Sequence, residues 1–215
     1  MEIIAYIYNS FDEKFGIPRQ SGFADTISEI RLSPPYNVPE ALRGLETFSH
    51  IWLLWLFSQN PTDRKFSPTV RPPRMGGNRR LGVFATRSPF RPNDIGLSCV
   101  ELCSVDTEKC SLIIKGADLM NGTPIIDIKP YIPFSDCRPG ASAPLFDGVI
   151  ARKNIRFEVS AEMLSDADRT ALTEILAQDP RPQYHNDERS YTFSFAGREI
   201  TFHCEREDIV VTKIV

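Results

Sequence analysis

Short apolar segments separated by proline and turn residues dominate the N-terminal part of the chain. Each segment is rich in β-branched and aromatic residues, which favour strands. The proline pairs Pro34-Pro35 and Pro72-Pro73, with single prolines between later segments, exclude long helices there. We therefore predict strands over residues 3–8, 27–32, 81–86, 95–102, 112–115 and 125–132.

A continuous apolar run, FSHIWLLWLF, occupies residues 48–57. Such a run fits either a strand buried on both faces or a short helix. We favour the strand, because a run without polar alternation is typical of a barrel or central-sheet element. A helical turn is predicted only over residues 38–43, between Pro35 and Gly44. This number of short strands indicates a closed or strongly curved β structure.

The composition changes after Asp136, where residues 138–148 (RPGASAPLFDG) are typical of a linker. Ser165 and Asp168 then form a variant of the capping box at the start of an amphipathic helix. The remaining predicted elements are a strand over 156–160, the helix over 165–178, a hairpin of 191–195 and 199–204, and a strand over 209–215. We expect a domain of residues 1–140 and a small α+β domain of residues 141–215.

The composition is that of an ordinary globular protein. The 215 residues are 41% hydrophobic and 25% charged, which is enough apolar material for a core and unlike a disordered chain. No apolar run reaches the roughly 18–20 residues that cross a bilayer, and the N-terminus lacks the features of a secretory signal. We expect a cytoplasmic protein with no membrane partner. The net charge of −3, taken as an average, argues against a nucleic-acid partner.

The distribution of charge changes that picture. The segment from residue 64 to residue 93 carries a charge of +8, which leaves −11 on the rest of the chain. Its basic residues are Arg64, Lys65, Arg71, Arg74, Arg79, Arg80, Arg87 and Arg91. Arginine forms forked hydrogen bonds to phosphates and stacks on bases, and Gly76-Gly77 allows close backbone approach. The segment therefore suits an anionic ligand such as RNA, a nucleotide or a carboxylate. The alternative interpretation is a charged surface that faces only solvent.

Two short motifs offer side chains for chemistry. The loop of residues 14–20 (KFGIPRQ) follows the first strand and is either a surface turn or a binding loop, with a backbone fixed by Pro18. In a strand, Asp127, Lys129 and Tyr131 share one face, and Ile126, Ile128 and Ile132 share the other. The first face offers a carboxylate base, a charge partner and a stacking ring. The alternative is a solvent-facing strand whose Asp127 and Lys129 form an incidental ion pair.

Other reactive residues carry weaker signals. His50 lies inside an apolar run and is expected to be a core histidine. The five cysteines are scattered; we interpret Cys99 and Cys103, four positions apart on one face of a strand, as small buried residues and predict no zinc site. No Gly-rich dinucleotide motif, P-loop, GxSxG or HExxH motif occurs. A nucleotide cofactor, if bound, would therefore not occupy a Rossmann fold.

Several blocks together resemble one family. They are KFGIPRQ (14–20), ALRGLETFSHIW (41–52), TVRPPRMGGNRRLGVFATRSPFRPNDIGLS (69–98) and DLMNGTPIIDIKPYIPFSD (118–136). The chain resembles the S-adenosylmethionine-dependent tRNA methyltransferases that methylate N6 of threonylcarbamoyl-adenosine at position 37, beside the anticodon. The block LAQDPRPQY (176–184) resembles the extra C-terminal domain of bacterial members.

The resemblance implies a mainly β fold, with a single closed β-barrel that binds S-adenosylmethionine and acts as a homodimer. The family often has His where this chain has Ser58, and Asp where it has Asn121. The implied cofactor residues are Pro18, Arg19, Gln20, Ser58, Gln59, Arg87, Leu97, Asp118, Leu119, Met120 and Asn121.

The resemblance also directs the interpretation of the remaining candidates. Asp127 is the expected proton acceptor, Tyr131 a positioning ring, and Lys129 or Arg91 the partner of a carboxylate or phosphate. The anticodon arm of tRNA is expected to contact Arg71, Arg74, Arg79, Arg80 and Arg91. The alternatives are a non-catalytic RNA-binding module that uses the segment from Arg64 to Arg91, and an enzyme acting on a small phosphorylated metabolite.

Overall fold

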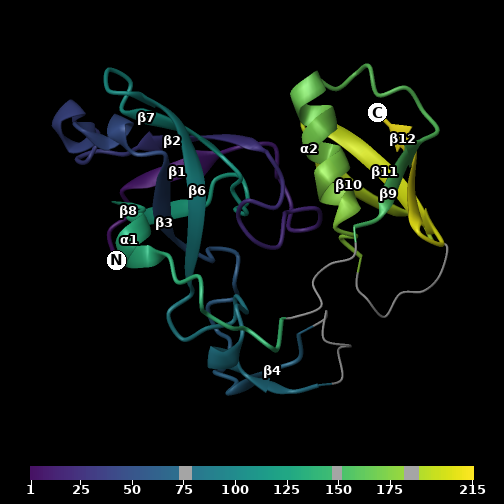
Figure 1. Cartoon of the computed structure of the whole chain (residues 1–215), viewed down its shortest axis with the longest axis horizontal. Coiled ribbons are helices and arrows are strands. Elements are labelled where there is room, and N and C mark those ends of the chain that lie inside the picture. The colour runs from purple at the N-terminus through teal and green to yellow at the C-terminus, as the bar shows by residue number, and fades with distance from the viewer. Residues whose placement is uncertain (73–78, 147–151, 182–188) are drawn as a thin grey trace.

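A computed structural model describes residues 1–72, 79–146, 152–181 and 189–215 (Figure 1). Its N-terminal part is a closed barrel with strand order β1-β2-β7-β6-β3-β8, all antiparallel. The strands are β1 (Ala5–Tyr8), β2 (Ile27–Leu32), β3 (His50–Leu56), β6 (Ile95–Asp106), β7 (Ser111–Lys115) and β8 (Pro124–Pro130). The predicted mainly β fold with one closed barrel is confirmed.

The apolar run forms strand β3, as predicted. Its side chains alternate, because Ile51, Leu53 and Trp55 are buried inside the barrel and their neighbours are half-buried on the outside. The expectation of burial on both faces was therefore wrong. Large apolar residues on the outer face concealed an ordinary strand alternation.

The predicted strand over 81–86 is the main departure in this half. Only β5 (Leu81–Gly82) is extended, and it pairs with the short strand β4 (Thr69–Val70) outside the barrel. A 3-10 helix, η4 (Val83–Ala85), follows, and Thr86 Oγ1 donates a hydrogen bond to the Val83 carbonyl at 2.8 Å. This local bond satisfies a backbone group that a strand would have used.

Short helical turns join the strands of the barrel. The predicted turn over 38–43 is the 3-10 helix η1 (Pro39–Leu42), and a second one, η2 (Leu45–Thr47), precedes β3. A short helix that the sequence did not predict, α1 (Pro133–Asp136), follows β8. No helix in the part of the chain described by the structure is long and apolar enough to cross a membrane.

The C-terminal part is a four-stranded sheet of order β10-β11-β12-β9 beside one helix (Figure 1). The elements are β9 (Asn154–Phe157), α2 (Asp166–Ala177), β10 (Tyr191–Phe195), β11 (Arg198–Glu205) and β12 (Asp208–Ile214). Ser165 caps α2 as predicted, since its Oγ accepts the Asp168 N–H at 3.1 Å. Ala196 and Gly197 both have positive φ, as a two-residue hairpin turn requires. The predicted α+β unit is confirmed.

The loop between β1 and β2 leaves the barrel and packs into the C-terminal unit. Phe11 and Ala24 are buried in the same core as Leu172 and Phe193. Gly16 lies so close to the Phe193 ring that a Cβ there would come within 2.6 Å of it. The second core is thus built from both ends of the chain.

Candidate functional site

Three segments expected to bind the cofactor meet at one end of the barrel. The guanidinium of Arg87 donates a hydrogen bond to Gln20 Oε1, 67 positions away in sequence. Lys14 Nζ donates to the Gln59 carbonyl at 3.2 Å, which joins the β1–β2 loop to the segment after β3. The exposed Ser58 lies next to Gln59. The structure therefore brings together candidates that are far apart in the sequence.

Asp118 adds a carboxyl group to this cluster. Ser98 Oγ donates to Asp118 Oδ1 at 2.5 Å and accepts from the buried Trp55 Nε1 at 3.0 Å. Burial raises the pKa of Asp118, while the Ser98 hydroxyl, the Arg87 charge and the Ser21 N–H oppose that rise. The result is a carboxyl group held in a fixed orientation beside a cation.

Asn121 supports the same loop. Its Oδ1 accepts the Asn9 N–H at 3.2 Å and its Nδ2 donates to Asp12 Oδ1 at 3.0 Å. An amide can make both bonds, whereas a carboxylate at this position would face the carboxylate of Asp12. This gives a physical reason for asparagine here, where the family resemblance led us to expect aspartate.

The other predicted cofactor residues differ in accessibility. Pro18 is buried, and Met120 is half-buried. Leu119 is 1% exposed in the barrel core, so its side chain cannot reach a ligand. Leu97 is 55% exposed on the outer face of β6. Arg19 turns toward the C-terminal unit, where its Nη2 donates to the carbonyls of Asp179 and Arg181.

The candidate catalytic residues lie on the outside of the barrel. Lys129 Nζ pairs with Asp127 Oδ2 at 2.8 Å, and both side chains are open to solvent. The Tyr131 ring lies 5.7 Å from the Trp52 ring, and burial raises the pKa of its hydroxyl. Among the described residues, no hydrogen bond or ion pair joins this group to Arg87 or Asp118. The chain thus carries two separate clusters.

The arrangement differs in detail from the expected alternation along β8. Residue Asp127 pairs with Leu54 and Ile125 pairs with Trp55, so Ile126 occupies a bulge. Ile125 and Ile128 face the barrel core, so the prediction that Ile126 shares a face with Ile128 was wrong. The bulge shifts the parity of the strand by one residue.

The basic segment contains two kinds of arginine. Arg64 pairs with Asp94 and donates to the Arg91 carbonyl, and Arg91 itself donates to the Thr86 carbonyl at 2.8 Å. These two side chains therefore hold the segment together. Arg71, Arg79 and Arg80 are exposed, and Arg74 lies outside the described residues.

Histidine and cysteine positions correct two further expectations. His50 is exposed at the start of β3, because the strand alternation turns it outward, so it is not a core residue. Cys99 is half-buried and Cys103 is exposed, so the expectation that both are buried was wrong; the buried cysteines are Cys110 and Cys204. Among the described residues, no group of His, Cys, Asp or Glu could hold a metal ion.

Comparison with known families covers nearly the whole chain. The family model of the tRNA-methyltransferase O N-terminal domain matches residues 6–137. The model of the TrmO C-terminal domain matches residues 151–215. The chain belongs to the tRNA-methyltransferase O family. The resemblance seen in the sequence blocks is thereby confirmed.

Relatives within the TrmO family are similar over most of their length. An Escherichia coli (strain K12) protein named tRNA (adenine(37)-N6)-methyltransferase is 46% identical over 88% of this chain and 85% of its own. An Eikenella corrodens protein of the same name is 44% identical over 74% of this chain and 93% of its own. A Pseudomonas aeruginosa relative, named as an S-adenosylmethionine-dependent methyltransferase, is 40% identical over 96% of this chain and 93% of its own.

Solved TrmO structures share the fold of this chain. A crystal structure of TrmO matches with a TM-score of 0.81 and 33% identity, over 99% of this chain and 97% of the other. A crystal structure of TrmO from Pseudomonas aeruginosa matches with the same TM-score and 34% identity, over 99% of this chain and 94% of the other. Both the barrel and the C-terminal unit therefore have counterparts in the family.

Sequence reasoning missed residues that hold the candidate site in place. Ser98 and Trp55 orient Asp118 from inside the barrel. Ser98 carried a usable signal, because it is a polar residue at an inward position of a predicted strand, between Gly96 and Val100. The attachment of Arg19 to Asp179 and Arg181 had no such local signal.

Proposed function

We propose that this chain transfers a methyl group from S-adenosylmethionine to N6 of adenosine 37 in tRNA that carries the threonylcarbamoyl modification. The activity at adenosine 37 follows from the family and from relatives named for it. The threonylcarbamoyl group is the finer part of the proposal. The single structural observation that supports methyl transfer from S-adenosylmethionine is the meeting of Gln20, Arg87 and Asp118 at one end of the barrel.

The side chains of this cluster fit S-adenosylmethionine by their chemistry. Arg87 is an exposed cation suited to the carboxylate of the amino-acid end, and Asp118 is a carboxyl group suited to its ammonium. Pro18, Gln20, Gln59 and Met120 would shape the walls around it. When bound, the cofactor supplies an electrophilic methyl group on a sulfonium. The protein's task is then to align donor and acceptor.

Asp127 is the proposed acceptor of the proton that N6 loses as the new C–N bond forms. Its Oδ2 faces Lys129 Nζ and its Oδ1 accepts the Ile128 N–H at 2.9 Å, which keeps the carboxylate oriented. Tyr131 and Trp52 provide neighbouring rings on which a base can stack. Lys129 would hold the carboxylate of the threonyl group.

The basic segment is the proposed binding surface for the anticodon arm. Arg71, Arg79 and Arg80 are exposed and would contact phosphates, with Arg74 in the same segment. Phe84 is 72% exposed and Phe90 is 51% exposed, and each lies near a guanidinium. Exposed rings among arginines suit the unstacked bases of a loop.

A homodimer is the proposed working form. Asp127 and Leu97 lie on the outer face of the barrel, whereas Ser98 directs Asp118 from inside it, so a partner is needed to join the two clusters. The outer face of β6 and β3 carries exposed or half-buried apolar residues, including Leu97. Light scattering at micromolar concentration should give twice the mass of 24.3 kDa. A cytoplasmic location is proposed because the substrate is tRNA.

The decisive test is methylation of defined tRNA by purified protein. Threonylcarbamoylated and unmodified tRNA would each be incubated with S-adenosylmethionine, digested and examined by nucleoside mass spectrometry. We expect a methyl group on N6 of the modified adenosine only. Asp127→Asn should lower kcat by about 10²–10⁴ with little change in cofactor affinity. Equal methylation of unmodified tRNA would contradict the threonylcarbamoyl substrate, and no cofactor binding would favour an RNA-binding module.

A further inference from the structure

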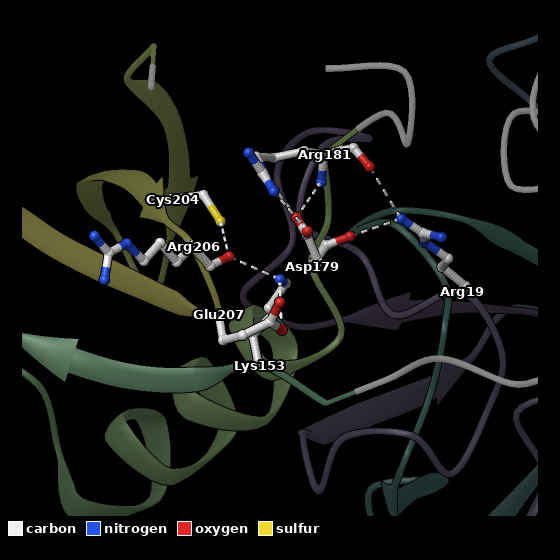
Figure 2. Close-up of polar contacts among 7 residues, drawn as sticks. All are labelled: Arg19, Lys153, Asp179, Arg181, Cys204, Arg206 and Glu207. Carbon is white, nitrogen blue, oxygen red and sulfur yellow. Dashed lines mark hydrogen bonds and ion pairs between the residues drawn. The ribbon is translucent and has the colours of Figure 1, made fainter. Parts of the chain in front are cut away.

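The C-terminal end of α2 holds the cofactor loop through Arg19. Figure 2 shows the Arg19 guanidinium directed at the turn after α2, where Nη2 donates to the Asp179 carbonyl at 2.8 Å and the Arg181 carbonyl at 3.3 Å. Both carbonyls lie in the turn beyond Ala177, the last residue of α2. The bond joins residues 160 positions apart.

The turn that offers these carbonyls is itself fixed by a forked ion pair. Arg181 Nε donates to Asp179 Oδ1 at 2.7 Å, and its Nη2 donates to Oδ2 at 2.8 Å (Figure 2). Arg181 is 8% exposed, and Asp179 has a φ of 48°. Two parallel bonds to one carboxylate define the orientation of both groups. The carbonyls that receive Arg19 therefore have little freedom to move.

Two further hydrogen bonds from α2 reach the second half of the same loop. Gln178 Nε2 donates to the Phe23 carbonyl at 2.9 Å. Glu174 Oε2 accepts the Asp25 N–H at 2.6 Å. Glu174 lies four positions before Gln178, so both side chains extend from one face of the helix. Together with Arg19, they attach the loop to α2 at three points.

The first half of the loop is anchored by aromatic packing. The Phe15 ring stacks on the Tyr191 ring at 6.0 Å and on the Phe202 ring at 6.3 Å. Gly16 lies against Phe193 with no room for a side chain. Residues 18–20 therefore lie between two fixed parts of the loop. Residues 15 and 16 pack on aromatic rings, and residues 23 and 25 are hydrogen-bonded to Gln178 and Glu174.

We propose that the C-terminal unit positions the cofactor loop, with Glu174, Gln178 and Arg181 acting as positioning residues for S-adenosylmethionine. The inference rests on the proposed role of residues 18–20 in cofactor binding. Arg19 acts through this attachment, while its neighbour Gln20 presents Oε1 to Arg87. The C-terminal unit thereby influences the cofactor affinity of the barrel through the β1–β2 loop.

The test measures cofactor binding by full-length variants. Gln178→Met removes the donor to Phe23 at similar side-chain volume, and Arg181→Met releases the turn. Lys153→Met is the matched control, because Lys153 is also largely buried and bonds to Arg206 and Glu207 in the same region without touching the loop (Figure 2). Calorimetry with S-adenosylhomocysteine and steady-state kinetics on tRNA are the readouts, with circular dichroism to check folding.

We expect the Kd for S-adenosylhomocysteine and the KM for S-adenosylmethionine to rise at least about 5-fold in Gln178→Met and Arg181→Met. The KM for tRNA and the values for Lys153→Met should stay unchanged. If Arg181→Met does not fold, Gln178→Met alone carries the test. Wild-type affinity in folded Gln178→Met would overturn the inference and leave the proposed function standing. No binding of S-adenosylhomocysteine by the wild type would instead overturn the proposed function.

Discussion

Ser98 and Asp118 are joined by a hydrogen bond of 2.5 Å between the inside of strand β6 and the turn that leads into β8. Ser98 is 1% exposed, and its oxygen also receives the Trp55 N–H. The bond therefore links the core of the barrel to the group proposed to face the cofactor. A buried hydroxyl that both donates and accepts leaves each neighbour in one orientation.

Ser98→Ala should weaken cofactor binding and shift its pH dependence. Removal of the hydroxyl takes away an interaction that lowers the pKa of Asp118, so the already raised pKa rises further. Cofactor binding that needs the ionised carboxylate should then be lost at a higher pH than in the wild type. Calorimetry with S-adenosylhomocysteine across a pH series measures this shift. An unchanged midpoint would exclude Asp118 as the titrating group.

The same group affects stability in a defined direction. Because burial raises the pKa of Asp118 in the folded state, the unfolded chain binds fewer protons between the ordinary carboxyl pKa and the raised one. The contribution of Asp118 to the free energy of unfolding therefore falls as pH increases across that window. Asp118→Asn should flatten this part of the profile measured by urea unfolding.

Gly96→Ala should destabilise the barrel by about 1–3 kcal/mol. A Cβ at Gly96 would overlap the indole ring of Trp55, which is packed inside the barrel. Gly82→Ala is the control, since a Cβ there meets no atom within 4 Å. Urea unfolding followed by circular dichroism compares the two. Equal stability of both variants would mean that Trp55 can repack freely.

Arg79→Gln and Arg80→Gln should each weaken tRNA binding in a salt-dependent way. Both side chains are exposed in the basic segment, so each loss should lower the slope of log K against log salt by about 1. Arg31→Gln removes the same charge from β2, where Arg31 pairs with Glu29. Filter binding at several salt concentrations gives the slopes. A slope change in Arg31→Gln as large as in Arg79→Gln would point to a nonspecific charge effect.

Acidification should release α1 from the barrel. The Trp52 Nε1–H and the Ile132 N–H both bond to Asp136 Oδ2, at 2.8 Å and 3.0 Å, and they lower the pKa of that carboxyl. Its stabilising effect is present above the ordinary pKa of aspartate and is lost as pH falls through the lowered value. Tryptophan fluorescence should report the transition.

Two variants separate this local transition from general acid unfolding. Asp136→Ala should remove the fluorescence change, because the carboxylate that holds Trp52 is gone. Asp106→Asn should retain it, since the pKa of Asp106 is also lowered but its carboxylate bonds to Lys109 in the β6–β7 turn. A transition that persists in Asp136→Ala would assign it to another group.

Local patterns were sufficient for most secondary structure. Strand β2 has the predicted limits, and α2 begins after Ser165 as its capping residues indicate. Errors arose where one position departs from the regular period. The bulge at Ile126 changes which side chains of β8 face the core. After Gly82 the chain forms a 3-10 turn, in which Thr86 Oγ1 donates to the Val83 carbonyl, instead of continuing as a strand. This bulge has no sequence signature of its own, because Ile125 and Ile126 are the same residue type and either could take the inward position.

The basic segment illustrates the same limit for charge. Its excess of arginine was evident from the sequence, but the division of labour among the arginines was not. Arg64 is neutralised by Asp94, one position beyond the acid-free stretch, and Arg91 is bonded to the carbonyl of Thr86. Which guanidinium remains open for a phosphate depends on how the segment folds over itself.

The sequence by itself determined the barrel, the α+β unit and the family, because side-chain alternation, helix capping and long motif blocks are local properties. Only the tertiary structure decided how the site is supported. Arg19 meets the end of α2, and Ser98 meets Asp118, through contacts that no local pattern encodes. Such contacts depend on the closure of the barrel and on the packing of Phe11 and Phe15 into the second core, where hydrophobic burial joins segments from opposite ends of the chain.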